Sequence, residues 1–213
     1  MNKFEILTCF EDERWQSLAG IDETLILKVR DAVLSTIKKE VDNIKCFGHW
    51  RQPVESELTA DFQSDWQAQL GGNGDTSGVS RMVLHFLNLD KNFVLNLVLS
   101  DDQTVHHLNK QFRNIDRPTN VLSIANIDDP FFDEILKSAE DIELGDVIMA
   151  FETLSKEADE LEISLKDHFC HLWVHGMLHI LGYDHIKDNE RLEMEAREVE
   201  ILKKLGIENP YQE

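Results

Sequence analysis

Three histidines near the carboxyl end of the chain have a spacing that suits metal binding. His175 and His179 are four residues apart in a segment with a helical pattern, and residues four apart lie one above the other on the same helix face. Gly182 ends this segment, because glycine adopts a positive φ at little cost, and the loop after it can return His185 to the same ion. Three neutral imidazoles leave a fourth tetrahedral position for water, as in catalytic zinc sites. The sequence therefore predicts one zinc ion per chain, bound by His175, His179 and His185.

The residue after the first of these histidines bears on the kind of reaction. The spacing H-x3-H-x2-G-x2-H is also that of the metzincin proteases, which need a glutamate directly after the first histidine as general base. Gly176 stands there in this chain, so a proteolytic mechanism has lost its proton acceptor. Asp184 lies between two predicted ligands and is better suited to forming the loop or orienting an imidazole. A metzincin-like metalloprotease is therefore an alternative that Gly176 disfavours, while a hydrolytic metal site is still expected.

The remaining histidines have no comparable spacing. We interpret His171 as a residue that supports a ligand or packs against the site, and His168 as an exposed residue of the first helical turn. The others are expected to be structural or to face solvent: His49, His85, His106 and His107.

A second segment that could do chemistry is LNKQFRNIDRPTNVLS, residues 108–123. Its residues 108–118 include three basic side chains and one acidic one, in a chain whose net charge is −20. Beside a metal ion, Arg113 could hold a phosphate through two parallel hydrogen bonds and stabilise the charge of phosphoryl transfer. The alternative is that Arg113 binds a backbone carbonyl or pairs with a carboxylate.

Helices and strands must position these two segments. Ser164 begins the histidine-bearing helix with a capping box, and this helix is apolar on almost all sides, as buried helices are. A capping box at 100–103 predicts a helix to about Phe112, with Val105, Leu108 and Phe112 facing inward. In the final helix we expect the acidic residues to form mostly a solvated face. The predicted strands are 4–10, 82–89, 93–99, 121–125 and 144–149. The remaining predicted helices are 22–39, 152–161 and 188–205.

Length and composition limit the possibilities further. With 213 residues, the chain is expected to form a single domain (1–213), with an insertion at about 43–80. The 41 acidic residues against 21 basic ones argue against a broad basic surface for duplex nucleic acid. No apolar run is long enough to span a membrane, and the first residues lack the apolar region of a signal peptide. The three cysteines are few and widely spaced, which indicates reduced thiols in a cytoplasmic protein.

Four ordered motifs resemble those of the YbeY family, the bacterial endoribonucleases of rRNA maturation. The family pattern H-G-x-L-H-L-x-G-[YH]-D-H matches residues 175–185, with Ile180 as a conservative variant. The chain departs from the family at Ile124-Ala125, where Phe-Pro is usual, and residues 43–80 have no counterpart in the shorter members. The other matching residues are Asn109, Phe112 and Arg113 before Pro118-Thr119-Asn120-Val121-Leu122-Ser123, the strand Leu144–Ile148, and the segment Leu205–Tyr211.

The resemblance implies a zincin-like α+β fold, with a small mixed β-sheet flanked by helices and the metal site at the end of a buried helix. It implies a zinc-dependent endoribonuclease specific for single strands, with His175, His179 and His185 as zinc ligands and Arg113 as a catalytic residue. The expected roles are small-subunit rRNA 3′-end maturation and ribosome quality control in the cytoplasm. The expected partners are single-stranded rRNA and the small ribosomal subunit. Binding to DNA or to a membrane is not expected. The second alternative is a non-catalytic ribosome-assembly factor with a structural metal.

Overall fold

A four-stranded mixed sheet forms the centre of the protein. The computed structural model describes residues 4–18, 20–46 and 91–212. The strands are β1 (Phe4–Phe10), β2 (Asn92–Ser100), β3 (Val121–Ala125) and β4 (Asp141–Ala150), in the spatial order β1-β2-β4-β3. β1, β2 and β4 run parallel, and β3 is antiparallel to β4. β3 is therefore an edge strand of the sheet.

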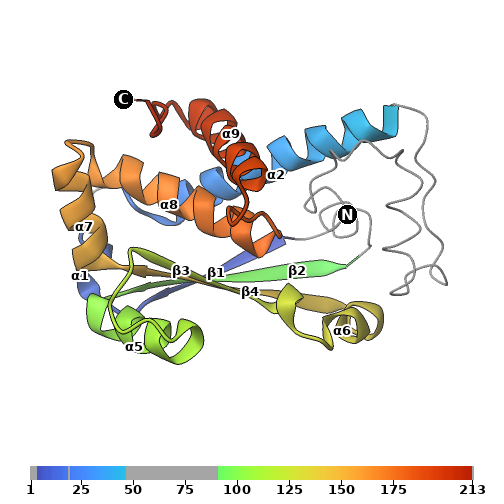
Figure 1. Ribbon diagram of the computed structural model, residues 1–213, viewed down its shortest axis with the longest axis horizontal. Coiled ribbons are helices and arrows are strands. Elements are labelled where there is room, and N and C mark those ends of the chain that lie inside the picture. The colour runs from blue at the N-terminus through green and yellow to red at the C-terminus, as the bar shows by residue number, and fades with distance from the viewer. Residues whose placement is uncertain (1–3, 19, 47–90, 213) are drawn as a thin grey trace.

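Helices cover both faces of this sheet (Figure 1). One face carries α2 (Glu23–Cys46), α8 (Leu165–Ile180) and α9 (Asp188–Leu205), with α8 next to the strands. The other face carries α5 (Asp102–Arg113) and α6 (Phe132–Ser138). The short α1 (Glu13–Gln16) and α7 (Phe151–Glu160) lie at one end, and the 3-10 helix η2 (Asn126–Asp128) follows β3. This arrangement confirms the predicted α+β class, a small mixed sheet flanked by helices.

The hydrophobic pattern of the sequence explains how these layers pack. Alternate residues of β2 are buried, among them Leu95, Leu97 and Leu99, because side chains of a strand alternate between its faces. α2 buries an apolar stripe with helical spacing as well, formed by Ile26, Val29, Val33 and Ile37. The core therefore lies mainly between the sheet and the layer of α2, α8 and α9.

Several boundaries differ from those that the sequence predicts. α2 continues to Cys46, so the first residues of the expected insertion at 43–80 belong to this helix, and the rest lie outside the described residues, as does the expected strand 82–89. The predicted capping box at 100–103 is wrong by one residue. Asp101 caps α5 by accepting the Thr104 N–H at 2.8 Å, while the Ser100 hydroxyl donates to Glu11 Oε2. Within the described parts of the chain, no helix combines the length and apolarity that crossing a bilayer requires.

Gly145 keeps the edge strand close to β4. It has a φ of +136° and stands where β4 contains an extra residue relative to β2, a bulge of the kind that glycine permits. An ideal Cβ at this position would lie 2.1 Å from the carbonyl oxygen of Ile124 in β3. Any other residue would therefore have to push β3 away from β4.

Replacing Gly145 with alanine should destabilise the protein strongly. We expect a loss of about 3 kcal/mol or more in the free energy of unfolding, because backbone strain and a backbone clash add. Gly206→Ala is the matched control: Gly206 also has a positive φ (+80°), but no atom lies within 4 Å of its ideal Cβ, so its cost should be about 1–2 kcal/mol. Urea unfolding followed by circular dichroism measures both, and equal losses would contradict the role of the β3 contact.

Candidate metal centre

The helix α8 carries two of the three predicted ligands on its partly exposed side. As predicted, Ser164 caps this helix by accepting the Asp167 N–H at 3.0 Å. Most of α8 is buried, whereas His175 and His179 are half-buried one turn apart. The helix thus holds two imidazoles rigidly at the boundary between core and solvent.

A tight reversal at the end of α8 brings in the third histidine. Gly182 has a φ of +89°, and the next N–H, of Tyr183, donates to the carbonyl of Leu178 at 2.9 Å. The Tyr183 side chain is buried and anchors the loop. Asp184 Oδ1 accepts the backbone N–H of His185 at 2.7 Å, so this aspartate shapes the loop.

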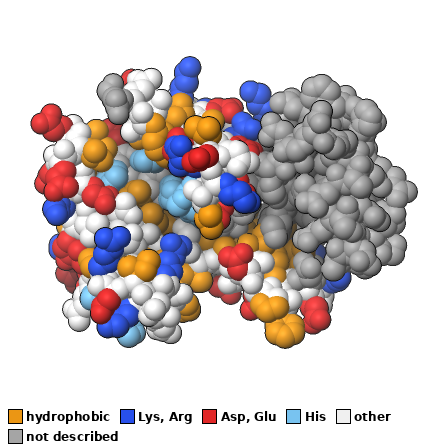
Figure 2. Space-filling model, in the orientation of Figure 1, with side chains coloured by type: hydrophobic (Ala, Val, Ile, Leu, Met, Phe, Trp, Pro, Cys, Tyr) orange, Lys and Arg blue, Asp and Glu red, His pale blue; other side chains and the backbone are white. Residues whose placement is uncertain are grey.

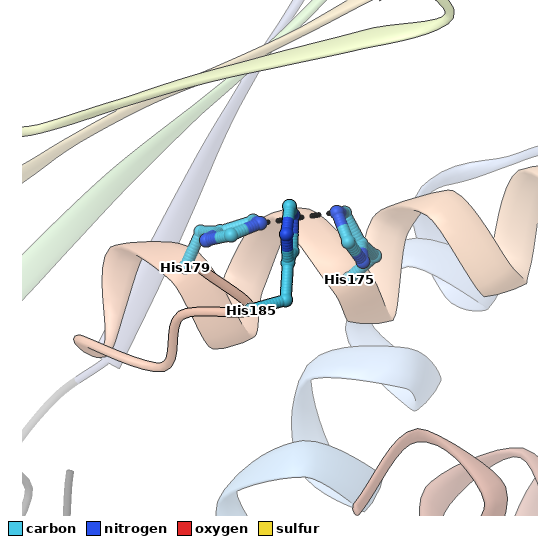
Figure 3. A group of neighbouring side chains, drawn as sticks. All are labelled: His175, His179 and His185. Atoms are coloured by element: carbon cyan, nitrogen blue, oxygen red, sulfur yellow. Dashed lines mark hydrogen bonds between the residues drawn. The ribbon is translucent and has the colours of Figure 1, made fainter. Parts of the chain in front are cut away.

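The three imidazoles face one another (Figure 3). One ligand nitrogen from each of His175, His179 and His185 lies within 4.8 Å of the other two. The ring centroids are 4.6 Å apart for His175 and His179, 4.9 Å for His179 and His185, and 5.6 Å for His175 and His185. The fold therefore gathers the three residues that the sequence singled out, and the cluster suits a metal ion.

The outer nitrogens of the two helical rings show which atoms are available to an ion. His175 Nδ1 is 2.8 Å from Glu198 Oε1, and His179 Nδ1 is 3.0 Å from the Tyr183 carbonyl oxygen. A carbonyl and an ionised carboxylate only accept, so both Nδ1 atoms must donate. In the neutral rings each Nε2 then carries a lone pair.

These two Nε2 atoms are 3.1 Å apart. Two lone pairs so close repel each other unless a cation lies beside both. Two nitrogens bound to one tetrahedral zinc ion at about 2.0–2.1 Å would be about 3.3 Å apart. The donor set therefore fits a divalent ion that prefers imidazole.

Burial keeps His179 neutral, which is the form of imidazole that binds a metal. Desolvation, together with the neighbouring His175 and His185, lowers the pKa of His179 to about 4. Burial alone would raise the pKa of Glu198, but hydrogen bonds from His171, His175 and Tyr211 lower it to about 2. At neutral pH, His179 is thus neutral and Glu198 is an ionised acceptor.

At Gly176, the helix α8 packs closely against the sheet. An ideal Cβ there would lie 2.6 Å from Val147 Cγ1 in β4 and 3.3 Å from Ser123 Oγ in β3. The position that carries the general base in metzincin proteases therefore faces the sheet and has no room for a glutamate. This finding adds a steric reason to the chemical argument against a protease.

Arg113 ends α5 on the far side of the same edge strand. Its Nη2 donates to the Ser123 carbonyl at 3.2 Å, and Ser123 Oγ lies 3.5 Å from the carbonyl of Gly176. Ser123 thus connects Arg113 with Gly176, the residue after His175. The sequence left open whether Arg113 holds a phosphate, binds a backbone carbonyl or pairs with a carboxylate. The contact with a carbonyl is present, and among the described residues no ion pair involves this arginine.

Two expectations about burial need correction. Phe112 follows Val105 and Leu108 on the apolar stripe of α5 and was expected to face inward, but it is 55% exposed. His168 was expected to be exposed and is instead 4% exposed, with its Nε2 2.8 Å from Glu157 Oε2. His106 faces solvent and contacts Asp116, while His49 and His85 lie outside the described residues.

Sequence reasoning missed Glu198, which belongs to the final helix. We expected the acidic residues of this helix to form mostly a solvated face, but Glu198 is 1% exposed. Its position gives a signal: it lies on the stripe of buried residues Met194, Ile201 and Leu202, where helical periodicity places the core-facing side. His171, interpreted as supporting a ligand, contacts the same carboxylate at 3.0 Å.

The site is open to solvent on one side. Figure 2 shows histidine side chains in a hollow of the surface, with lysine and arginine side chains at its borders. Since His185 is exposed, a large substrate can reach the three rings.

Comparison with known proteins identifies relatives of this chain. The family model described as Endoribonuclease YbeY matches residues 73–206. Endoribonuclease YbeY of Paramagnetospirillum magneticum is 52% identical over 119 residues, covering 56% of this chain and 71% of the relative. The protein of the same name from Zymomonas mobilis is 44% identical over 152 residues, covering 70% and 85%. The solved structure of TM1509 from Thermotoga maritima aligns with 98% of this chain and 100% of its own at 17% identity, with a TM-score of 0.44.

The contact between Gly176 and Val147 can be tested by a double-mutant cycle. Gly176→Ala should cost about 1–3 kcal/mol of unfolding free energy through overpacking, and Val147→Ala should cost about as much through a cavity. Combined, they should cost at least about 1 kcal/mol less than the sum, because the smaller side chain removes the clash. Urea unfolding of the four proteins measures this coupling, and additivity to within about 0.5 kcal/mol would contradict the close approach.

Proposed function

Because the chain belongs to the endoribonuclease YbeY family, we propose that it cleaves single-stranded RNA at the site formed by His175, His179 and His185. The observation that carries the proposal is the convergence of three imidazole nitrogens within 4.8 Å at a solvent-open position. We further propose that residues 1–213 form one domain with an insertion at about 43–80.

Zinc is the proposed metal, with one ion per chain. Three neutral imidazoles without a carboxylate suit zinc, whereas magnesium and calcium prefer oxygen ligands. His175, His179 and His185 would hold the ion through Nε2 of the two helical rings and one nitrogen of the third. A zinc ion bound there supplies Lewis-acid chemistry at a phosphoryl oxygen.

Arg113 is proposed to bind the scissile phosphate. One of its N–H donors is held by the Ser123 carbonyl, which fixes the guanidinium and leaves its other donors available. Several basic residues of this acidic chain are paired with carboxylates, such as Lys110 with Asp116 and Arg191 with Glu195. Among the described residues, no ion pair involves Arg113 or Arg117, so both retain their charge for a phosphate.

The surface beside Arg113 supports a preference for unpaired RNA. Phe112 is 55% exposed and Ile115 is 40% exposed, and an exposed aromatic ring is a platform on which an unpaired base stacks. In a duplex the bases already stack on each other, and a net charge of −20 opposes a broad contact with duplex phosphates. We therefore propose single-stranded RNA, and not DNA, as the substrate.

The family resemblance supports a more specific role. We propose that the substrate is the 3′ end of small-subunit rRNA, that the protein acts in its maturation and in ribosome quality control, and that the small ribosomal subunit is a partner. Such a substrate places the reaction in the cytoplasm.

The deciding experiment measures zinc content and RNA cleavage together. Wild type should contain about one zinc per chain by elemental analysis and cut a single-stranded RNA oligonucleotide, and a chelator should abolish cleavage. His179→Ala should lose both properties, because it removes a ligand, whereas His106→Ala should retain them, because His106 contacts Asp116 and not the cluster. A peptide library tested in parallel addresses the protease alternative.

Two results would refute the proposal. Wild type that holds zinc without cutting any single-stranded RNA supports the non-catalytic assembly factor. Turnover of peptides supports the metzincin-like alternative.

Replacing Arg113 with alanine should separate catalysis from metal binding. We expect cleavage to fall on the order of 10²-fold, as when a charge-stabilising donor is removed from an active site, while zinc content stays unchanged. The comparison variant is Lys110→Ala, whose charge is already paired with Asp116 and whose loss should change cleavage little. If zinc is lost with Arg113, the arginine supports the fold and not the reaction.

A further inference from the structure

We propose that Glu198 and Tyr211 position His175 for metal binding. The inference adds two residues to the proposed function and rests on it in one respect, that the histidine cluster binds an ion. It assigns a role to α9 and to the segment after it, neither of which supplies a ligand.

Glu198 is a buried carboxylate with donors on both oxygens. Its Oε1 accepts from His175 Nδ1 at 2.8 Å, and its Oε2 accepts from His171 Nε2 at 3.0 Å and from the Tyr211 hydroxyl. Glu198 is only 1% exposed. A buried charge is costly unless it is hydrogen-bonded, and here three donors share that charge.

This arrangement fixes the tautomer of His175. An ionised carboxylate against Nδ1 requires the proton to be on that nitrogen, so the lone pair is on Nε2, which faces His179. A carboxylate behind a ligand imidazole also makes the far nitrogen a better donor to a metal and fixes the ring plane. Glu198 therefore acts on the ion through His175 and not by contact.

Tyr211 closes the other side of the carboxylate. Its ring lies edge-on to His171, with centroids 5.7 Å apart at 90°, and its backbone N–H is held by Asn209 Oδ1 at 2.9 Å. Burial and the negative charge of Glu198 raise the pKa of Tyr211, so its hydroxyl remains a donor. The segment after α9 thus supplies the third hydrogen bond to the buried carboxylate that holds His175.

The test is the zinc affinity of the full-length protein, measured by competition with a chromophoric chelator. Glu198→Gln should weaken zinc binding 10- to 100-fold, the usual cost of losing a partner behind a ligand histidine. Tyr211→Phe should weaken it about 3- to 10-fold, since it removes one of the three hydrogen bonds. Glu200→Gln is the matched control, because Glu200 is on the same helix but pairs with Arg197 and Lys39.

A spectroscopic readout separates positioning from a purely structural role. Long-range ¹H–¹⁵N spectra of the zinc-free protein should show His175 protonated at Nδ1 in wild type and in Glu200→Gln, and a mixture of tautomers in Glu198→Gln. Circular dichroism establishes whether each variant is folded. If Glu198→Gln is not folded, Tyr211→Phe decides, because that change leaves the buried carboxylate in place.

The outcomes distinguish this inference from the proposed function. If folded Glu198→Gln binds zinc within twofold of Glu200→Gln, the role of this network is overturned and the zinc site still stands. The same result for Tyr211→Phe overturns that role when Glu198→Gln is not folded. The inference would also be overturned if the spectra showed His175 of the wild type without a proton on Nδ1. Wild type that binds no zinc would refute the metal site itself and the inference with it.

Discussion

Each half-buried imidazole of α8 has to satisfy both of its nitrogens, and the arrangement of the site follows from this requirement. Away from water, a polar atom without a partner costs free energy comparable to a lost hydrogen bond. Glu198 satisfies Nδ1 of His175, and the Tyr183 carbonyl satisfies Nδ1 of His179. The two Nε2 atoms face each other at 3.1 Å. A cation beside both atoms would satisfy them together, and the exposed ring of His185 would complete the set.

The opposite side of α8 determines where those rings lie. Gly176 lets the helix approach Val147 so closely that any side chain larger than hydrogen at this position would clash. Gly145 holds β3 against β4, which keeps Ser123 within reach of both Gly176 and Arg113. Two glycines therefore couple the histidines on one face of the sheet to the arginine that reaches its edge from the other face.

Local patterns predicted the parts of this design that depend on residues near one another in sequence. The His175–His179–His185 spacing, the Ser164 cap and the stop at Gly182 each lie within a few residues, and helical geometry converts them directly into positions. Glu198 could not be assigned in this way, because its partners lie on another helix and no spacing records the contact. Phe112 and His168 were misplaced for a related reason: burial depends on what the rest of the fold places against a side chain, such as Glu157 of α7 against His168. The short α1, α6 and η2 lack a long enough pattern to predict.

The distribution of charge at the site favours a phosphodiester over a peptide. A peptide carbonyl is neutral, so a protease gains from a carboxylate beside its metal that accepts a proton. A phosphodiester brings its own negative charge, and a free carboxylate facing it would repel it. Here the carboxylates that contact the site are occupied elsewhere, Glu198 by His175 Nδ1 and Asp184 by a backbone N–H. At the position where a metzincin protease has its glutamate, this chain has Gly176 packed against the sheet. Arg113, which has no ion pair among the described residues, lies across the edge strand. An acidic protein can thus present Arg113 and the histidine cluster to RNA while its nearby carboxylates are held by donors of the protein itself.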